Sequence, residues 1–131
     1  MRLSDVMDDV AIRLRSIQAF RSVFEYPAGS VTPPAAIVSY PESFNPHATY
    51  AHGAEEFTGL PVIVVAGRAS ERTARDVLSG FVSDVVTALE ASGYTAFDVL
   101  TVTSVDFNGA TIGETDYIAA IFNCDIVGSG A

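Results

Sequence analysis

The sequence predicts an α+β (mixed α/β) fold, with two main helices packed on one face of a largely antiparallel sheet of about five strands. The run Leu60–Ala66 is apolar throughout and too short for a helix, which is typical of a strand buried on both faces. Apolar residues between Val77 and Leu89 recur at the helical period along one stripe. The segments 96–107 and 116–127 alternate in the manner of strands.

The N-terminal part of the chain is predicted to contain one helix and two short strands. Ser4 is the expected N-cap of a helix of about 14 residues. Strands are expected at 21–26 and 35–40, and the segment 42–58 is predicted to be a long irregular loop. The apolar face of the helix consists of Val6, Met7, Val10, Ala11, Leu14 and Ile17.

The second half is predicted to add one long helix and a hairpin. Ser70 is the candidate N-cap of the helix, and Gly93 stands where a left-handed C-cap residue belongs. Asn108–Gly109 is a strong hairpin-turn signal, with a longer hairpin tip that extends through Gly113 as the alternative. The segment 128–131 is predicted to be a flexible tail. The expected order is therefore α-β-β-β-α-β-β, in a single domain covering 1–131.

The charge is unevenly distributed along the chain. The formal net charge is −9, which argues against nucleic-acid binding through phosphate contacts. All seven basic residues are arginines that precede position 76, so the first 75 residues carry a net −1 and the last 56 a net −8. This split is compatible with a solvated acidic surface. It also fits a molecule whose basic side meets the acidic side of a neighbouring copy, as in a head-to-tail ring.

The predicted sheet has more apolar surface than two helices can cover. The strands at 60–66 and 117–122 are apolar on both faces, whereas two helices cover one face. We expect either the 42–58 segment or another subunit to cover the second face.

The sequence contains no recognisable catalytic motif, so we expect no enzymatic activity and no cofactor. His47 and His52 lie close to Glu55 and Glu56, which leaves a small metal- or ligand-binding module as an alternative to solvent-exposed histidines. Cys124 lies in a strand pattern and is interpreted as a small buried hydrophobe. The aromatic residues Phe44, Tyr50, Phe57 and Tyr40 are either an interface anchor or local packing.

Three stretches carry a resemblance to a known family: Ser30–Pro41 (SVTPPAAIVSYP), Tyr94–Asp98 (YTAFD) leading into Thr101–Ser104 (TVTS), and Asp116–Gly130 (DYIAAIFNCDIVGSG). With the helix-first layout, they resemble tail terminator proteins of siphovirus-type bacteriophages, of the kind found in phages of GC-rich actinobacterial hosts. These motifs are structural and identify no active site.

The resemblance implies a structural virion protein that forms a ring, typically a homohexamer. Such a ring caps the tail tube, ends tube polymerisation and provides the surface that joins the tail to the head–neck complex. The implied partners are further copies of the chain, the major tail tube protein and head–neck connector proteins. DNA would pass through the pore without specific binding, which an acidic lining favours. No membrane is involved.

The implied location is the head-proximal end of the virion tail, with the host cytoplasm as the site of assembly. The alternative within the same setting is another neck component, such as a head-completion, stopper or tail-joining protein.

Two groups of residues are predicted to make the contacts of such a ring. In the first group, arginines of one subunit would face acids of the next, beside apolar strand residues. The predicted subunit interface is Val62, Val64, Arg68, Arg72, Arg75, Asp98, Asp106, Asp116, Ala119 and Ile121. The predicted contacts with the tube or the pore are Phe44, Tyr50, Glu55, Glu56, Phe57, Asn108 and Glu114.

Overall fold

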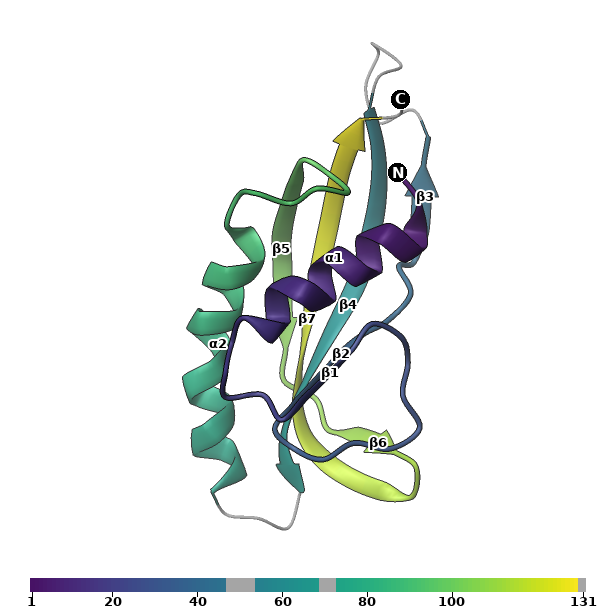
Figure 1. The fold of residues 1–131 in the computed structure, drawn as a ribbon. Helices are drawn as coiled ribbons and strands as arrows, with labels where there is room; N and C mark the ends of the chain where they lie inside the picture. The colour runs from purple at the N-terminus through teal and green to yellow at the C-terminus, as the bar shows by residue number, and fades with distance from the viewer. Residues whose placement is uncertain (47–53, 69–72, 130–131) are drawn as a thin grey trace.

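A computed structural model describes residues 1–46, 54–68 and 73–129 of the chain. It confirms a mixed α+β fold with two helices and a largely antiparallel sheet, which contains seven strands where about five were expected (Figure 1). The elements are α1 (Leu3–Arg15), β1 (Ser22–Phe24), β2 (Ala35–Val38), β3 (Ser43–Asn45), β4 (Ala54–Arg68), α2 (Ala74–Glu90), β5 (Val99–Asp106), β6 (Ala110–Ile112) and β7 (Thr115–Ser129).

Two long antiparallel strands, β4 and β7, form the centre of the sheet. Their register runs from Ala54 opposite Ser129 to Arg68 opposite Tyr117. The strand order is β1-β2-β4-β7-β5, with β3 paired to β4 and β6 paired to β7. Of these pairs, β1 with β2 is parallel and the rest are antiparallel. The strands β1 and β5 are therefore the two edges of the main path.

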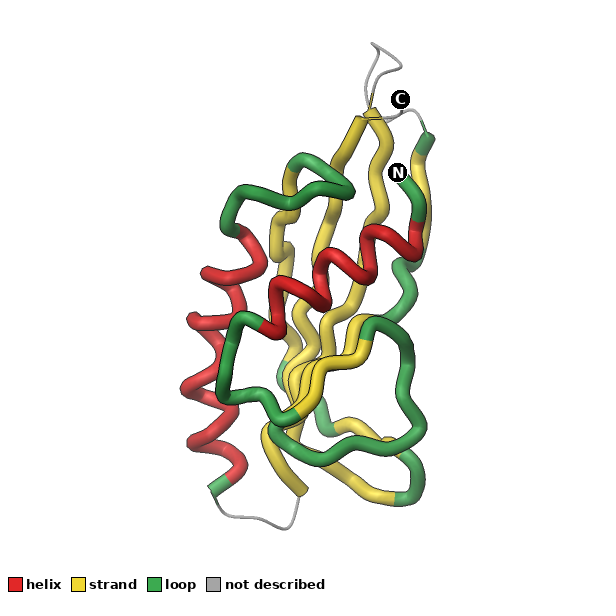
Figure 2. The backbone as a smooth tube through the Cα atoms, in the orientation of Figure 1, coloured by secondary structure: helices red, strands yellow, loops and turns green. Residues whose placement is uncertain are grey.

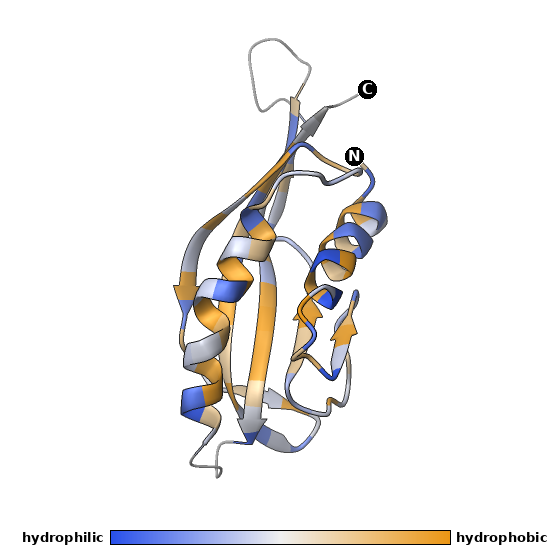
Figure 3. Cartoon of the chain, turned by 60° about the vertical axis from the view of Figure 1, so that its left-hand side comes forward, coloured by the Kyte–Doolittle hydropathy of each residue, from blue (hydrophilic) through white to orange (hydrophobic). Residues whose placement is uncertain are grey.

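Both helices lie on the same face of the sheet (Figures 1 and 2). The helix α1 packs against β1 and β2, whereas α2 packs against β4, β5 and β7. In the hydropathy colouring of Figure 3 the central strands are largely hydrophobic, while both helices mix hydrophobic and hydrophilic residues. The fully buried side chains of the core between the helices and the sheet include Val10, Leu14, Leu60, Val85, Leu89, Phe122 and Ile126.

The two helices begin at other residues than the capping signals indicated. The helix α1 starts at Leu3 with Arg2 as an extended N-cap, so Ser4 lies inside the helix. The helix α2 starts at Ala74 with Thr73 as N-cap, and neither N-cap residue makes a side-chain capping hydrogen bond. Ser70 lies outside the described residues.

The prediction of an irregular loop at 42–58 was wrong over its described part. Ser43–Asn45 forms β3 and pairs with Glu56–Thr58, which belong to the first part of β4. The predicted tail is also partly regular, because Gly128 and Ser129 pair with Glu55 and Ala54. These segments form strands because each pairs with a part of the chain that is distant in sequence. The local sequence pattern therefore does not predict them as strands.

The predicted hairpin is present, and of its two predicted forms the longer tip through Gly113 is confirmed. After Asn108–Gly109 the chain forms β6, which still pairs with β7, and it reverses at Gly113, whose φ is +64°. A register shift between Val102 and Ser104 marks a bulge in β5. Because of this bulge, Val105 packs against the core beneath the helices, although Val99 at the start of β5 is 55% exposed.

Candidate assembly surfaces

The first group of predicted interface residues includes three that are core residues, Val62, Val64 and Ala119. Val62 and Val64 of β4 are 0% exposed and belong to the cluster beneath the helices. Ala119 of β7 is 2% exposed and lies in a second core cluster. These three residues have no surface to offer a neighbouring subunit in this fold, so their assignment to the interface was wrong. The sequence of a strand that is apolar on both faces does not indicate which face the helices cover, so it could not show that Val62 and Val64 point towards them.

The chain covers part of the opposite face of the sheet, hereafter the outer face, with its own residues. Val65, Tyr117 and Ala119 are buried there and form a second cluster. Residues from the 25–34 connection and from β6 pack against this cluster, including Val31 and Ile112. An added Cβ at Gly113 would lie 3.2 Å from the carbonyl oxygen of Gly29, so the β6–β7 turn approaches that connection closely.

The rest of the outer face is a mixture of apolar and hydrogen-bonded polar side chains. Asn123 of β7 donates from Nδ2 to the Oγ of Ser104 at 3.0 Å and to Oδ2 of Asp106 at 2.8 Å. The backbone N–H of Gly59 donates to Oδ1 of Asp125 at 3.2 Å. Ile121 is half-buried beside these groups. Asp125 of β7 thus accepts a backbone N–H group at the β4 bulge, and Asn123 links β7 to two side chains of β5.

Large exposed apolar side chains occur at both edges of the sheet. Tyr26 follows the edge strand β1 and is 52% exposed, and Tyr40 follows β2 and is 60% exposed. At the other edge, Val99 begins β5 and Phe107 follows it, with 55% and 63% of their surfaces exposed. Tyr26, Val99 and Phe107 were not singled out from the sequence, because strand patterns give no information on which edge stays uncovered.

An apolar groove of about 400 Å³ lies beside the first of these edges, hereafter the tyrosine groove. Glu25 at its rim accepts a hydrogen bond from Arg15 Nη2 at 2.7 Å. A hydrogen bond from the backbone, followed by the Arg15 contact, lowers the pKa of the Glu25 carboxyl. The groove is lined by Leu3, Ser4, Met7, Asp8, Glu25, Tyr26 and Tyr40.

The predicted arginines at 68 and 75 lie at the end of β4 and in the first turn of α2. Both are exposed, and Arg75 makes a 3.9 Å contact with Asp76 in which both side chains are more than three-quarters exposed. Such a contact contributes little. The side chain of Arg68 makes no hydrogen bond or ion pair with any residue in the described ranges. Arg72 lies outside those ranges.

The three acids predicted to face the arginines are not brought together. Asp106 is bonded to Asn123, and Asp116 accepts a hydrogen bond from the Oγ1 of Thr111 at 2.6 Å. Asp116 precedes Tyr117, which is the register partner of Arg68, so it lies at the same end of the sheet as Arg68. Asp98 is exposed and lies at the opposite end, where its backbone N–H bonds to Val127.

The residues predicted to contact the tube or pore divide between the two ends of the sheet. Phe44, Glu55, Glu56 and Phe57 lie on β3 and β4 at the end of the sheet where α1 begins and β7 ends (Figure 1). The carboxylate of Glu55 forms an ion pair with the amino group of Met1, at a distance of 2.6 Å. Phe57 is buried and packs against Phe44, with their ring centroids 4.8 Å apart.

Two further residues of that prediction, Asn108 and Glu114, lie at the other end of the sheet. Asn108 and Glu114 are exposed near the β6–β7 turn, at the end of the sheet where Arg68 lies. Tyr50 is outside the described residues. The predicted group is therefore two separate surfaces.

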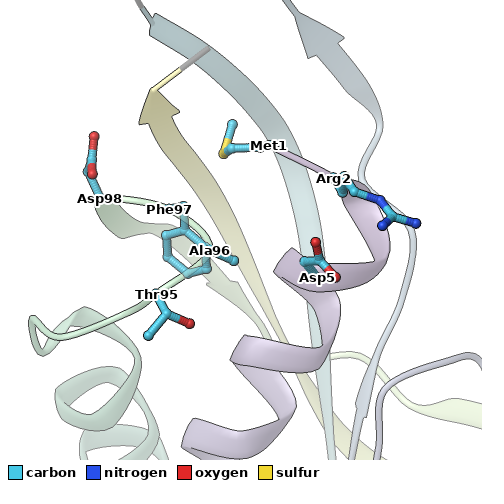
Figure 4. Close-up of a pocket in the computed structure, with 7 residues that line it drawn as sticks. All are labelled: Met1, Arg2, Asp5, Thr95, Ala96, Phe97 and Asp98. Carbon is cyan, nitrogen blue, oxygen red and sulfur yellow. The ribbon is translucent and has the colours of Figure 1, made fainter. Parts of the chain in front are cut away.

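A second hollow of about 340 Å³ lies between the start of α1 and the connection from α2 to β5 (Figure 4). Asp5 and Asp98 lie on opposite walls of it. The wall containing Thr95 and Ala96 is held by Asp9, whose Oδ2 accepts both backbone N–H groups at 2.8 and 2.9 Å. These hydrogen bonds hold the α2–β5 connection against α1. They do not indicate a catalytic or binding role for the hollow.

No metal centre or membrane helix is evident in the described part of the chain. Three or more His, Cys, Asp or Glu side chains do not gather around any point among the described residues. His47 and His52 lie outside them. No helix within the described ranges is long and apolar enough to cross a membrane.

A scan of protein-family models finds no match to the chain, and a search of curated proteins finds none either.

Proposed function

We propose that this chain is a structural protein that assembles head-to-tail into a ring, in the role of a tail terminator of a long-tailed bacteriophage. The observation that carries the assembly is the presence of large exposed apolar side chains at both edges of the sheet, Tyr26 and Tyr40 at one and Val99 and Phe107 at the other. Exposed aromatic residues are enriched where protein surfaces meet.

The two edges differ in chemistry, which favours contacts between unlike surfaces. One edge has a groove whose lining includes the carboxylates of Asp8 and Glu25, whereas the β5 edge exposes the apolar side chains of Val99 and Phe107. A contact between unlike surfaces repeats around an axis and closes into a ring or continues into a filament. A ring is the form that a terminator requires.

The β5 edge is also protected against uncontrolled strand pairing. The carboxylate of Glu90, at the end of α2, accepts a hydrogen bond from the backbone N–H of Val102 at 3.0 Å. A charged side chain on an edge strand opposes its extension by another strand. This supports assembly through side chains rather than through an open-ended sheet.

The proposed role assigns different partners to the two ends of the molecule. One end carries Glu55, Glu56 and Asp98, and the other carries Arg68, Arg75 and Glu114. In a ring whose axis follows β4 and β7, these ends form opposite faces. One face binds the tail tube subunit, and the other binds the head–neck connector.

Light scattering after size exclusion, with electron microscopy of the same fractions, tests this function. We expect a closed ring, and we expect its addition to polymerising tail tube protein to stop tube growth. A chain that stays monomeric through the micromolar range and leaves tube length unchanged contradicts the proposal. Binding to the connector without binding to the tube would assign another neck role.

A further inference from the structure

We infer that the hollow between β1 and the 25–34 connection, hereafter the Arg21 pocket, binds the phosphate group of a small organic phosphate. The pocket has a volume of about 500 Å³, which lies in the range of small-molecule sites. This inference goes beyond the proposed function and does not depend on a ring. The pocket is lined by Arg21, Ser22, Phe24, Ser30, Val31 and Thr32.

The Arg21 pocket lies on the outer face of the sheet. Val23 packs against the core between the helices and the sheet, so its neighbours Ser22 and Phe24 in β1 point to the outer face. On the other wall, Val31 of the 25–34 connection packs against the outer-face cluster. The side chains of Ser22 and Phe24 are therefore directed into the space that the connection encloses.

Arg21 gives this pocket a positive charge that no lining residue neutralises. Its side chain is exposed and makes no hydrogen bond or ion pair with any described residue. Among the described residues no Asp or Glu lines the pocket, whereas the tyrosine groove and the hollow beside the start of α1 each contain two carboxylates. Glu114, in the turn that approaches Gly29, is not a lining residue either. A guanidinium group binds phosphate through parallel N–H donors.

The hydroxyl groups of the pocket supply further donors for the same group. The Oγ of Ser22 is buried and has no hydrogen-bond partner among the described residues, which is unfavourable for a hydroxyl. Ser30 and Thr32 are exposed on the opposite wall, and their hydroxyls make no hydrogen bond within the described ranges. A phosphate group offers more acceptor oxygens than a carboxylate. It is therefore the better match to one guanidinium with several hydroxyls.

The remaining lining is apolar and suits an organic substituent on the phosphate. Phe24 and Val31 are both half-buried, one on each wall. A ring or alkyl group between them would lose contact with water, while the phosphate stays at Arg21. We therefore expect an aromatic phosphate ester to bind more tightly than inorganic phosphate.

Isothermal titration calorimetry of the full chain with phenyl phosphate tests the pocket. At constant ionic strength we expect saturable binding of one phenyl phosphate per chain. Inorganic phosphate should bind at least about threefold more weakly, because it makes no contact with Phe24. Benzoate, which has the ring but a carboxylate in place of the phosphate, should also bind more weakly.

Two arginine variants separate the pocket from the general effect of charge. Arg21→Gln removes the guanidinium and should weaken phenyl phosphate binding at least about tenfold. Arg2→Gln is the matched control, because it removes the same charge from another exposed arginine, beside α1, that does not line the pocket. It should bind as the wild type does.

Ser22→Ala distinguishes a ligand-binding hydroxyl from a structural one. Because the Oγ of Ser22 is buried without a partner, its removal should not lower the midpoint of thermal unfolding in the absence of phosphate. The same variant should weaken phenyl phosphate binding at least about threefold.

Three results would overturn the inference. The first is the absence of saturable binding of phenyl phosphate, or an affinity that Arg21→Gln leaves unchanged. The second is an equal loss of affinity in Arg2→Gln, which would assign the binding to overall charge. The third is a Ser22→Ala variant that melts at a lower temperature and binds as the wild type does, since its hydroxyl would then be structural. Each of these results leaves the proposed ring untouched.

Discussion

The guanidinium group of Arg13 lies over the ring of Tyr94, with its Cζ 4.0 Å from the ring centroid. The same group donates hydrogen bonds to the carbonyl oxygens of Ala88, Ala91 and Ser92 at 2.8, 2.7 and 3.0 Å. Carbonyl groups at the end of a helix have no partners within the helix. Arg13, which belongs to α1, therefore caps the C-terminal end of α2 and joins the two helices.

Replacing Arg13 by alanine should lower the free energy of unfolding by about 2 kcal/mol, because several charge-assisted hydrogen bonds are lost and the end of α2 is left open. Urea denaturation followed by circular dichroism measures this difference. Arg15→Ala is the matched control, since it removes an arginine of the same helix whose pair with Glu25 is exposed, and it should cost less than about 1 kcal/mol. Equal losses in the two variants would contradict the role given to Arg13.

Phe122 and Ile121 are adjacent in β7 but face opposite sides of the sheet. Phe122 is 0% exposed beneath the helices, whereas Ile121 is half-buried on the outer face. Phe122→Ala should cost about 3–5 kcal/mol because it leaves a cavity, and Ile121→Ala less than about 2 kcal/mol. Denaturant titration compares the two. A larger loss for Ile121→Ala would reverse the assignment of the two faces.

The burial of Cys124 predicts a thiol that does not react while the chain is folded. Burial, with smaller contributions from Asp125 and Glu90, raises the pKa of this thiol from its ordinary value of about 9 to about 12. The thiolate is the reactive form, so we expect no reaction with a disulfide reagent near about pH 8 until denaturant is added. Rapid labelling of the folded chain would contradict this burial.

The same shift predicts a loss of stability in alkali. The folded chain holds the Cys124 proton more tightly than the unfolded chain, so the thiol has no effect below about pH 9. Between about pH 9 and pH 12 the unfolded chain loses this proton first, and the free energy of unfolding falls. Cys124→Ala should flatten the fall in urea denaturation measured across this range. An identical slope in the variant would assign the loss to other groups, including Tyr94, whose pKa burial also raises.

The parts of the fold that a local pattern determines could be predicted from the sequence. Leu78, Phe81, Val85 and Leu89 recur at helical spacing, and all four are buried on one side of α2. The pattern suffices here because a helix buries the stripe that its own period creates.

The parts that depend on a distant partner could not be predicted. Glu55 and Glu56 are poor strand residues by themselves, yet they lie in β4 because Gly128 and Val127 pair with them. The candidate surfaces depend on tertiary structure in the same way. Tyr26 and Phe107 are exposed because of what the helices and loops leave uncovered, and neither lies in a motif. The groove beside Tyr26 joins α1 to two strand ends, so its residues share no sequence pattern.

Gly59 and Gly80 should respond in opposite ways to replacement by alanine. Gly59 occupies a bulge of β4 with a φ of +67°, and an added Cβ would lie 2.8 Å from Cγ of Glu42. Gly59→Ala should therefore lower the free energy of unfolding by about 1–2 kcal/mol. Gly80 lies in α2 with no atom within 4 Å of an added Cβ, so Gly80→Ala should raise it by about 0.5–1 kcal/mol. Thermal and urea denaturation measure both; a stabilising Gly59→Ala would contradict the left-handed bulge.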